Sequence, residues 1–190
     1  AESTAQISEV RSLYNRVPSN LVGNIKNAQK LIDAESMLLA LQAIEAIKLI
    51  PTEEKLAKSD KSIVENAREA FNLVPKNIQE KVTNIEALVR AEHLINVFDV
   101  EESISNLPET VKLSHTSLFK ALADAIKAIP NELQSKIANI QIYNEKLALL
   151  QQLQLNASDE GYANIVRELI NKLPKEVTLE HKAQLEEARQ

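Results

Sequence analysis

The sequence predicts an all-α fold made of tandem helical repeats, stacked as an elongated three-helix-type array or rod. The first observation is that the 190 residues contain only 2 glycines, too few for the left-handed turns of a many-stranded β protein. The second is that the 6 prolines each follow a short helical stretch that ends in apolar residues. The third is an internal correspondence between successive segments of the chain, which is typical of helical arrays.

The internal repeat is visible in the proline positions. Alternate prolines, Pro18, Pro75 and Pro130, recur at nearly equal intervals along the chain. Placing residues 8–35 over residues 65–92 aligns Arg11 with Arg68, Asn15 with Asn72, Asn27 with Asn84, and Ala34-Glu35 with Ala91-Glu92. Before each closing proline, Glu45, Glu102 and Glu168 coincide, as do Ile47, Ile104 and Ile170. We therefore divide the chain into repeat 1 (residues 1–58), repeat 2 (residues 59–114) and repeat 3 (residues 115–190).

Each repeat opens with a helix, which we expect over residues 4–17, 61–74 and 117–129. In repeat 1 the apolar residues of this helix follow at helical spacing: Ile7, Val10, Leu13, Tyr14 and Val17. Each opening helix stops at a proline, because the residue before a proline is disfavoured in the α conformation. Ser19, or the residues just after the equivalent proline, then start a short helix of one or two turns.

A long helix follows from a recurring asparagine: Asn27, Asn84 or Asn139. We predict that this asparagine is the N-cap, with its side-chain oxygen accepting a hydrogen bond from a free amide of the first turn. The helix runs toward the next proline over about 23 residues, roughly 35 Å at 1.5 Å per residue. Its expected apolar stripe in repeat 1 is Leu31, Leu38, Leu41, Ile44 and Ile47, while Lys30, Gln42, Glu45 and Lys48 are expected to face water.

Repeat 3 departs from this pattern by 11 extra residues around positions 155–165. We expect its long helix to break near Asn156 and Ser158 to cap a new helix. Asp159 and Glu160 would stabilise the start of that helix, because negative charges interact favourably with the positive end of the helix dipole. The tail, residues 175–190, resembles the opening of a further repeat. Because the chain begins at Ala1 without Met or an apolar leader, we interpret it as a mature, processed product or an excised segment.

One repeat has too little apolar surface to be stable alone, so we expect stability to grow as neighbouring repeats cover each other. The linkers after Pro51 and Pro108 are short and polar, and either rigid corners or modest hinges would fit them.

Residues 62–95, SIVENAREAFNLVPKNIQEKVTNIEALVRAEHLI, carry an "AR-x-A-[YF]-N" helix, a turn, and then "Q-x-x-V-x-N-x-x-x-L-x-x-AE-x-x-I". This stretch resembles a helical repeat of Gram-positive surface proteins, where it occurs beside S-layer homology and Ig-like domains. The matching residues are Ala67, Arg68, Ala70, Phe71, Asn72, Gln79, Val82, Asn84, Leu88, Ala91, Glu92 and Ile95. Repeat 1 keeps Arg11, Tyr14, Asn15, Asn27, Ala34 and Glu35 of the pattern. The resemblance implies an extracellular location at the bacterial cell wall, in or beside an S-layer, and brings no catalytic residues with it.

The composition excludes several classes of site. Cysteine is absent, which excludes disulfides, thiolate metal ligands and cysteine nucleophiles. The net charge is −5 with mixed signs along the chain, so we expect neither nucleic acid nor anionic lipid as a partner. No apolar run approaches the roughly 20 residues needed to cross a bilayer, so membrane insertion is not expected.

The polar residues do not assemble into a sequence-local active site. The histidines, His93, His115 and His181, share no i,i+3 or i,i+4 spacing, so a local zinc site is not predicted. Ser62 and Ser117 lie near expected helix starts, where capping accounts for them. Carboxylate pairs such as Glu53-Glu54, Glu101-Glu102, Asp159-Glu160 and Glu186-Glu187 are expected to be solvated, since adjacent residues on a helix point about 100° apart.

Three further patterns have both a purely structural and a functional interpretation. Asp99, Glu101 and Glu102 are the oxygen-rich cluster that could bind Ca²⁺, although the calcium-loop pattern is missing. Asn156-Ala157-Ser158 fits an N-glycosylation triplet, but a capping role is favoured. Tyr14 and Phe71 are equivalent in the repeat and are expected in the core. We predict no catalytic, cofactor-binding or metal-binding residues and no enzymatic activity.

The sequence thus favours a structural spacer or assembly module of a bacterial cell-surface protein. Its expected partners are neighbouring domains or copies of the same surface protein, with a cell-wall polymer as a further candidate. The alternative is a binding module for cell-wall polysaccharide or a host or partner protein, for which the insertion with Gly161 and Tyr162 is the first place to look. An intracellular helical scaffold is a third hypothesis.

Overall fold

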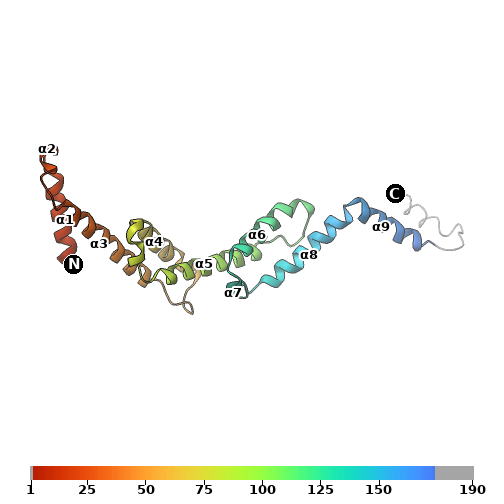
Figure 1. Cartoon of the computed structure of the whole chain (residues 1–190). Coiled ribbons are helices and arrows are strands. Elements are labelled where there is room, and N and C mark those ends of the chain that lie inside the picture. Colours follow the sequence, from red (N-terminus) through yellow and green to blue (C-terminus); the bar gives the residue numbers. More distant parts are fainter. Residues whose placement is uncertain (1, 174–190) are drawn as a thin grey trace. The chain divides into compact units, whose positions relative to one another are not determined.

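A computed structural model describes residues 2–173, and this part of the chain consists of helices joined by turns and loops, with no strand (Figure 1). The all-α prediction is therefore confirmed for the described residues. The chain forms two compact units, Ala1–Asp99 and Val100–Gln190, and the division falls within helix α5 (Ile85–Ser105). The predicted tail of residues 175–190, together with His181 and Glu186-Glu187, lies outside the described residues.

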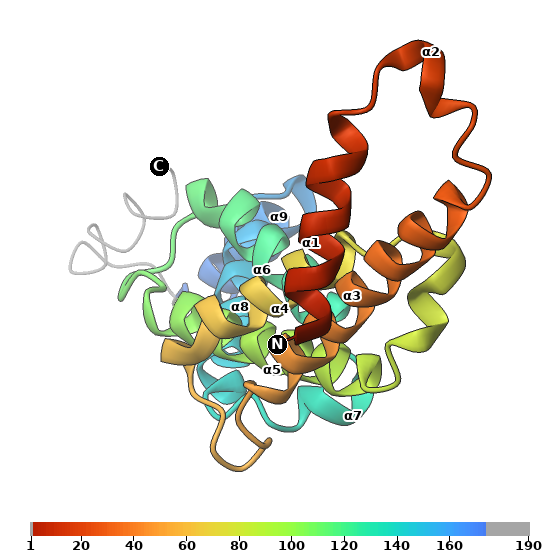
Figure 2. The same ribbon diagram turned by 90° about the vertical axis from the view of Figure 1, so that its left-hand side faces the viewer.

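Repeat 1 contains α1 (Glu2–Asn15), α2 (Ser19–Val22) and α3 (Ala28–Lys48). Helix α1 packs along α3, and Figure 2 shows the two side by side with α2 in the turn between them. The first helix ends two residues earlier than expected. The reason is that the amides of Arg16 and Val17 bond back three residues, to the carbonyls of Leu13 and Tyr14, and so tighten the last turn before Pro18.

Repeat 2 contains η1 (Lys58–Asp60), α4 (Lys61–Asn72), η2 (Lys76–Lys81) and α5. Both α4 and η2 pack against α3, so the second repeat lies on the long helix of the first. The α3 residues buried in this packing are Ala40, Ala43 and Ile47. Small side chains at two of these positions allow the helices to approach closely.

The predicted apolar stripe of α3 is therefore partly wrong. Leu41 is 52% exposed, and Leu31, Leu38 and Ile44 are only half-buried, whereas Ile47 is buried as expected. The buried face of α3 is rotated slightly around the helix axis from the predicted one, because α4 covers the side that carries Ala40 and Ala43. The predicted water-facing residues Lys30, Gln42, Glu45 and Lys48 are all exposed.

The second compact unit contains the end of α5, η3 (Leu113–His115), α6 (Thr116–Ala128), α7 (Asn131–Gln134), α8 (Ile140–Asn156) and α9 (Asp159–Asn171). Phe119 of α6 stacks on Tyr143 of α8, with ring centroids 5.9 Å apart. The predicted break of the long helix at Asn156 is confirmed. Ser158 caps α9 as predicted, its hydroxyl accepting a hydrogen bond from the Gly161 amide at 3.1 Å.

Candidate functional site

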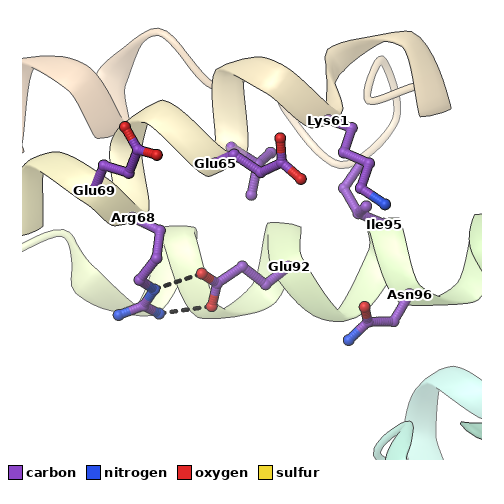
Figure 3. Close-up of a pocket in the computed structure, with 8 residues that line it drawn as sticks. Lys61, Glu65, Arg68, Glu69, Glu92, Ile95 and Asn96 are labelled. Carbon is purple, nitrogen blue, oxygen red and sulfur yellow. Dashed lines mark hydrogen bonds and ion pairs between the residues drawn. The ribbon is translucent and has the colours of Figure 1, made fainter. Parts of the chain in front are cut away.

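The most structured polar feature is a clamp between the first helix and the long helix of repeat 2. The Arg68 guanidinium donates two hydrogen bonds to the Glu92 carboxylate, at 2.5 and 2.6 Å (Figure 3). Its central carbon also lies 5.3 Å from the ring centroid of Phe71, within cation–π range. The hydrogen bond from Arg68 to Glu92 raises the pKa of Arg68. The clamp fixes α4 to α5 while both charged groups stay about one-third exposed.

Repeat 1 holds the same clamp at the aligned positions. The Arg11 guanidinium donates to both oxygens of Glu35 and lies 5.2 Å from the ring centroid of Tyr14. The hydrogen bond from Arg11 lowers the pKa of Glu35. The core positions predicted for Tyr14 and Phe71 are wrong: both residues are half-buried, because each ring supports a guanidinium at the surface.

Repeat 3 lacks the clamp. When Pro130 is placed on Pro75, the positions of Arg68 and Glu92 are taken by Ala123 and Leu147. Neither of these two side chains can form an ion pair, so repeat 3 has no guanidinium–carboxylate bond at these positions.

A shallow groove of about 350 Å³ runs beside the clamp in repeat 2, between α4 and α5. Lys61 and Asn96 line it together with the clamp residues (Figure 3). The Lys61 ammonium donates to Asp99 at 2.8 Å, so the charged groups Lys61, Arg68 and Glu92 all have partners on the protein. Such a groove can make polar contacts to a hydroxyl-rich ligand.

A second feature joins successive repeats. The Asn84 side-chain amide donates to the backbone carbonyl of Ile44 in α3 at 3.0 Å. The Asn139 amide donates to the carbonyl of Glu101 in α5 at 2.8 Å. Ile44 and Glu101 are equivalent positions, each directly before one of the aligned glutamates Glu45 and Glu102. Each asparagine therefore fixes the start of one long helix to the final third of the previous long helix.

The N-cap hydrogen bond predicted for these asparagines is wrong. Neither Asn27 nor Asn139 makes a side-chain cap bond, although both occupy the N-cap position. The Oδ1 atoms of Asn84 and Asn139 are buried and have no hydrogen-bond partner among the described residues. In Asn84 and Asn139 a neighbouring helix holds the side-chain amide nitrogen, so the side chain is directed to that helix rather than to its own first turn.

The residues considered for metal or acid–base chemistry are dispersed or have protein partners. His115 accepts a hydrogen bond at Nδ1 from the Lys112 amide at 3.1 Å, and His93 is half-buried on α5. Glu101, one of the calcium candidates, accepts from the Ala138 amide at 2.7 Å. Asp99, another, pairs with both Lys61 and Lys58. Within residues 2–173, no three His, Asp or Glu side chains converge on a point where a metal ion could be held.

The serine interpretation also needs correction. Helices α4 and α6 begin at Lys61 and Thr116, so Ser62 and Ser117 are second residues of these helices and do not cap them. Asp60 takes the flanking position instead, and its carboxylate accepts a hydrogen bond from the Ala57 amide.

The clamp was not predicted from the sequence, although the repeat alignment contains all four of its charged residues. A signal was present: the arginine and the glutamate have the same separation in both repeats, Arg11 to Glu35 and Arg68 to Glu92. The asparagine bond had a weaker signal, since an asparagine at a helix start is equally well explained by capping.

No protein-family model, curated protein or solved structure matches this chain. None of the described helices is both long enough and apolar enough to cross a membrane.

Proposed function

We propose that the chain is a structural spacer and assembly module of a bacterial cell-surface protein, in or beside an S-layer. The observation that carries this proposal is the asparagine bond between successive long helices. Asn84 and Asn139 make the same contact to equivalent carbonyls, so each repeat is seated on the one before it. When each repeat contacts the previous one in the same way, the chain grows in one direction, and an elongated shape of this kind suits a spacer.

The three repeats, residues 1–58, 59–114 and 115–190, would then stack in series as a rod. Each additional repeat lengthens the rod by about the 30 Å of a 21-residue helix. Contacts to neighbouring domains or to other copies of the same surface protein would be individually weak. Their combined strength would come from multivalency in a lattice.

The cell-surface location rests on the resemblance of residues 62–95 to the Gram-positive surface repeat. Three residues of that pattern, Arg68, Asn84 and Glu92, are also the residues that make the clamp and the junction. Arg68 and Glu92 hold the helices of one repeat together and Asn84 joins that repeat to the one before it, which supports using the pattern to infer the role.

A binding module for cell-wall polysaccharide is the second candidate, favoured by the groove beside the clamp. Guanidinium, carboxylate and amide groups of Arg68, Glu92 and Asn96 lie together there (Figure 3). Sugars are recognised by hydrogen bonds of this kind. The groove is open, and its Lys61, Arg68 and Glu92 groups already bond to other protein groups, so we favour the spacer.

Two measurements test the proposal. Antibody against the chain should label intact cells of the Gram-positive bacterium that encodes it, and labelling only after lysis would contradict a surface role. Co-sedimentation with purified cell walls separates the two candidates. The spacer predicts no retention. Retention that is abolished by the groove substitution Asn96→Ala would establish the polysaccharide function instead.

A further inference from the structure

A surface between the first helix and the long helix is exposed in repeat 1, whereas the equivalent surface of repeat 2 is buried. A groove of about 360 Å³ lies between α1 and α3 and is lined by Ile7, Val10, Asn27, Leu31 and Ala34 among others. Their equivalents in repeat 2 are Val64, Ala67, Asn84, Leu88 and Ala91. Val10 is 50% exposed where Ala67 is 0% exposed, and Met37 is 42% exposed where Leu94 is 5% exposed. The same surface is thus a core in one repeat and open in the other.

The structure also shows what covers this surface in repeat 2. The carboxyl-terminal half of α3 lies on α4 and η2, with Ala40, Ala43 and Ile47 buried, and the Ile44 carbonyl accepts from Asn84. The surface therefore takes a helix with small or branched apolar residues at spacings of three and four. Asn27, the counterpart of Asn84, is exposed and makes no cap bond, so its amide is available to such a helix.

A helix of this type with an open face is present near the other end of the described sequence. Aligned through Ile47, Ile104 and Ile170, the residues Ala40, Ala43 and Ile47 correspond to Ala163, Val166 and Ile170 of α9. Ile170 is 54% exposed, in contrast to Ile47 at 2% and Ile104 at 1%. Ala163 is exposed and Val166 is half-buried. Helix α9 thus presents the residue pattern that the open groove accepts.

We propose that α9 of one copy docks into the α1–α3 groove of a second copy, so that the chain assembles head to tail. Ala163, Val166 and Ile170 would replace Ala40, Ala43 and Ile47, and the Asn27 amide would donate to the Arg167 carbonyl, the counterpart of Ile44. The groove and the helix are different surfaces, so the contact does not close on itself and copies add in an open series. This inference deepens the proposed assembly role by naming the partner as a second copy.

The test is sedimentation equilibrium of the full chain over concentrations from about 10 µM to about 1 mM. The expected result is an average mass that rises continuously with concentration. A chain that stays monomeric throughout, or a mass that stops at a dimer, would overturn the head-to-tail contact.

Two variants each block one end. Val10→Lys places a charge in the groove, and Ile170→Lys places one on α9; both residues are at least half exposed, so the fold should tolerate the change. Each variant alone should remain monomeric. An equimolar mixture should form a 1:1 heterodimer and nothing larger, because one copy keeps its α9 and the other keeps its groove. A mixture without heterodimer, or variants that assemble as the wild type does, would contradict the proposal.

The matched control is Leu73→Lys, a charge at another exposed leucine that belongs to neither surface; it should assemble like the wild type. Asn27→Ala should weaken assembly several-fold without changing the melting temperature of the monomer. These results are separate from the spacer proposal, which concerns the stacking of repeats within one chain and would survive a strictly monomeric protein.

Discussion

The Arg68–Glu92 clamp combines a bidentate ion pair with a guanidinium over an aromatic ring, and it joins α4 to α5 at the surface. Its groups are about one-third exposed, so solvent screening limits what the pair contributes to stability. Its value to the fold is geometric, because two parallel hydrogen bonds fix the rotation of one helix against the other.

The clamp should respond differently to single and double substitution. Arg68→Ala should lower the free energy of unfolding by about 1 kcal/mol, because Glu92 loses both of its hydrogen bonds. The double variant Arg68→Ala/Glu92→Leu installs the residues found at Ala123 and Leu147, and should recover most of that loss. Urea unfolding followed by circular dichroism measures both. A double variant as unstable as two independent losses would show that the pair has no apolar substitute in repeat 2.

The junction asparagines offer a matched comparison. Asn84→Ala removes a hydrogen bond to the Ile44 carbonyl and should destabilise the chain by about 0.5–1.5 kcal/mol. Asn27→Ala, at the equivalent position in repeat 1, removes no such bond and should leave the stability of the monomer unchanged. Thermal unfolding at low concentration compares the two. Equal losses would indicate that both asparagines act through their own helix rather than through a junction.

Asp99 gives the stability a dependence on pH. Burial raises its pKa, but the hydrogen bonds from Lys61 and Lys58 outweigh burial and hold the pKa below the usual 3.8. Because the folded pKa is the lower one, the pair stabilises the fold fully above about pH 4 and loses this effect as the pH falls through the folded pKa. Asp99→Asn should therefore cost about 0.5–1 kcal/mol at pH 7 and progressively less as the pH falls below about 4. A cost that does not fall as the pH drops below about 4 would contradict the ion pair.

At the scale of helices, Gly161 determines how α9 leaves α8. A Cβ built on Gly161 would lie 1.8 Å from the backbone carbonyl oxygen of Leu155, so the two helices meet at a point that admits no side chain. The sequence marked Gly161 as a possible binding feature of the insertion. The structure shows that Gly161 packs against the backbone of α8, while the neighbouring Tyr162 is 60% exposed.

The two glycines make a controlled pair for substitution. Gly161→Ala should destabilise α9 by about 2 kcal/mol or more, because the clashing atom belongs to the backbone and cannot rotate away. Gly23→Ala has open space around the new Cβ and a helical φ of −62°, so it should be neutral or stabilise by about 0.5 kcal/mol. Differential scanning calorimetry measures both. Similar melting temperatures for the two variants would contradict the role of Gly161.

The helices were largely predictable from the sequence, because prolines at 18, 75 and 130 and a serine at 158 carry their own conformational rules. The break at Asn156 followed from the same rules. What each helix face touches was not predictable to the same degree. Leu41 and Ala40 are neighbours on α3, and only the position of α4 decides that the alanine is buried and the leucine exposed.

The hydrogen-bond partners of the junction asparagines were likewise not predictable from the sequence. Capping needs only the local chain, so a sequence pattern can propose it, whereas the bond from Asn139 to Glu101 needs a neighbour far away along the chain. The open groove on repeat 1 lay beyond sequence reasoning too, since Val10 and Ala67 occupy the same repeat position and differ in what covers them.

At the scale of the whole molecule, the serial stacking that we propose would make the repeats interchangeable. Excision of residues 59–113 joins Lys58 to Ser114, which is the counterpart of Ser59 when Pro130 is placed on Pro75. Repeat 3 should then be seated on α3, with Asn139 donating to the Ile44 carbonyl in place of Asn84. Helical content per residue should be retained, because the same junction is rebuilt with one repeat fewer.

Small-angle scattering of the full chain and of this shortened chain tests the stacking of repeats most directly. A compact globule of this length would have a radius of gyration of about 16 Å. Serial stacking predicts a value well above this for the full chain, and a maximum dimension that falls by about 30 Å when residues 59–113 are excised. A full chain near the globular value, or a shortened chain that unfolds, would contradict it.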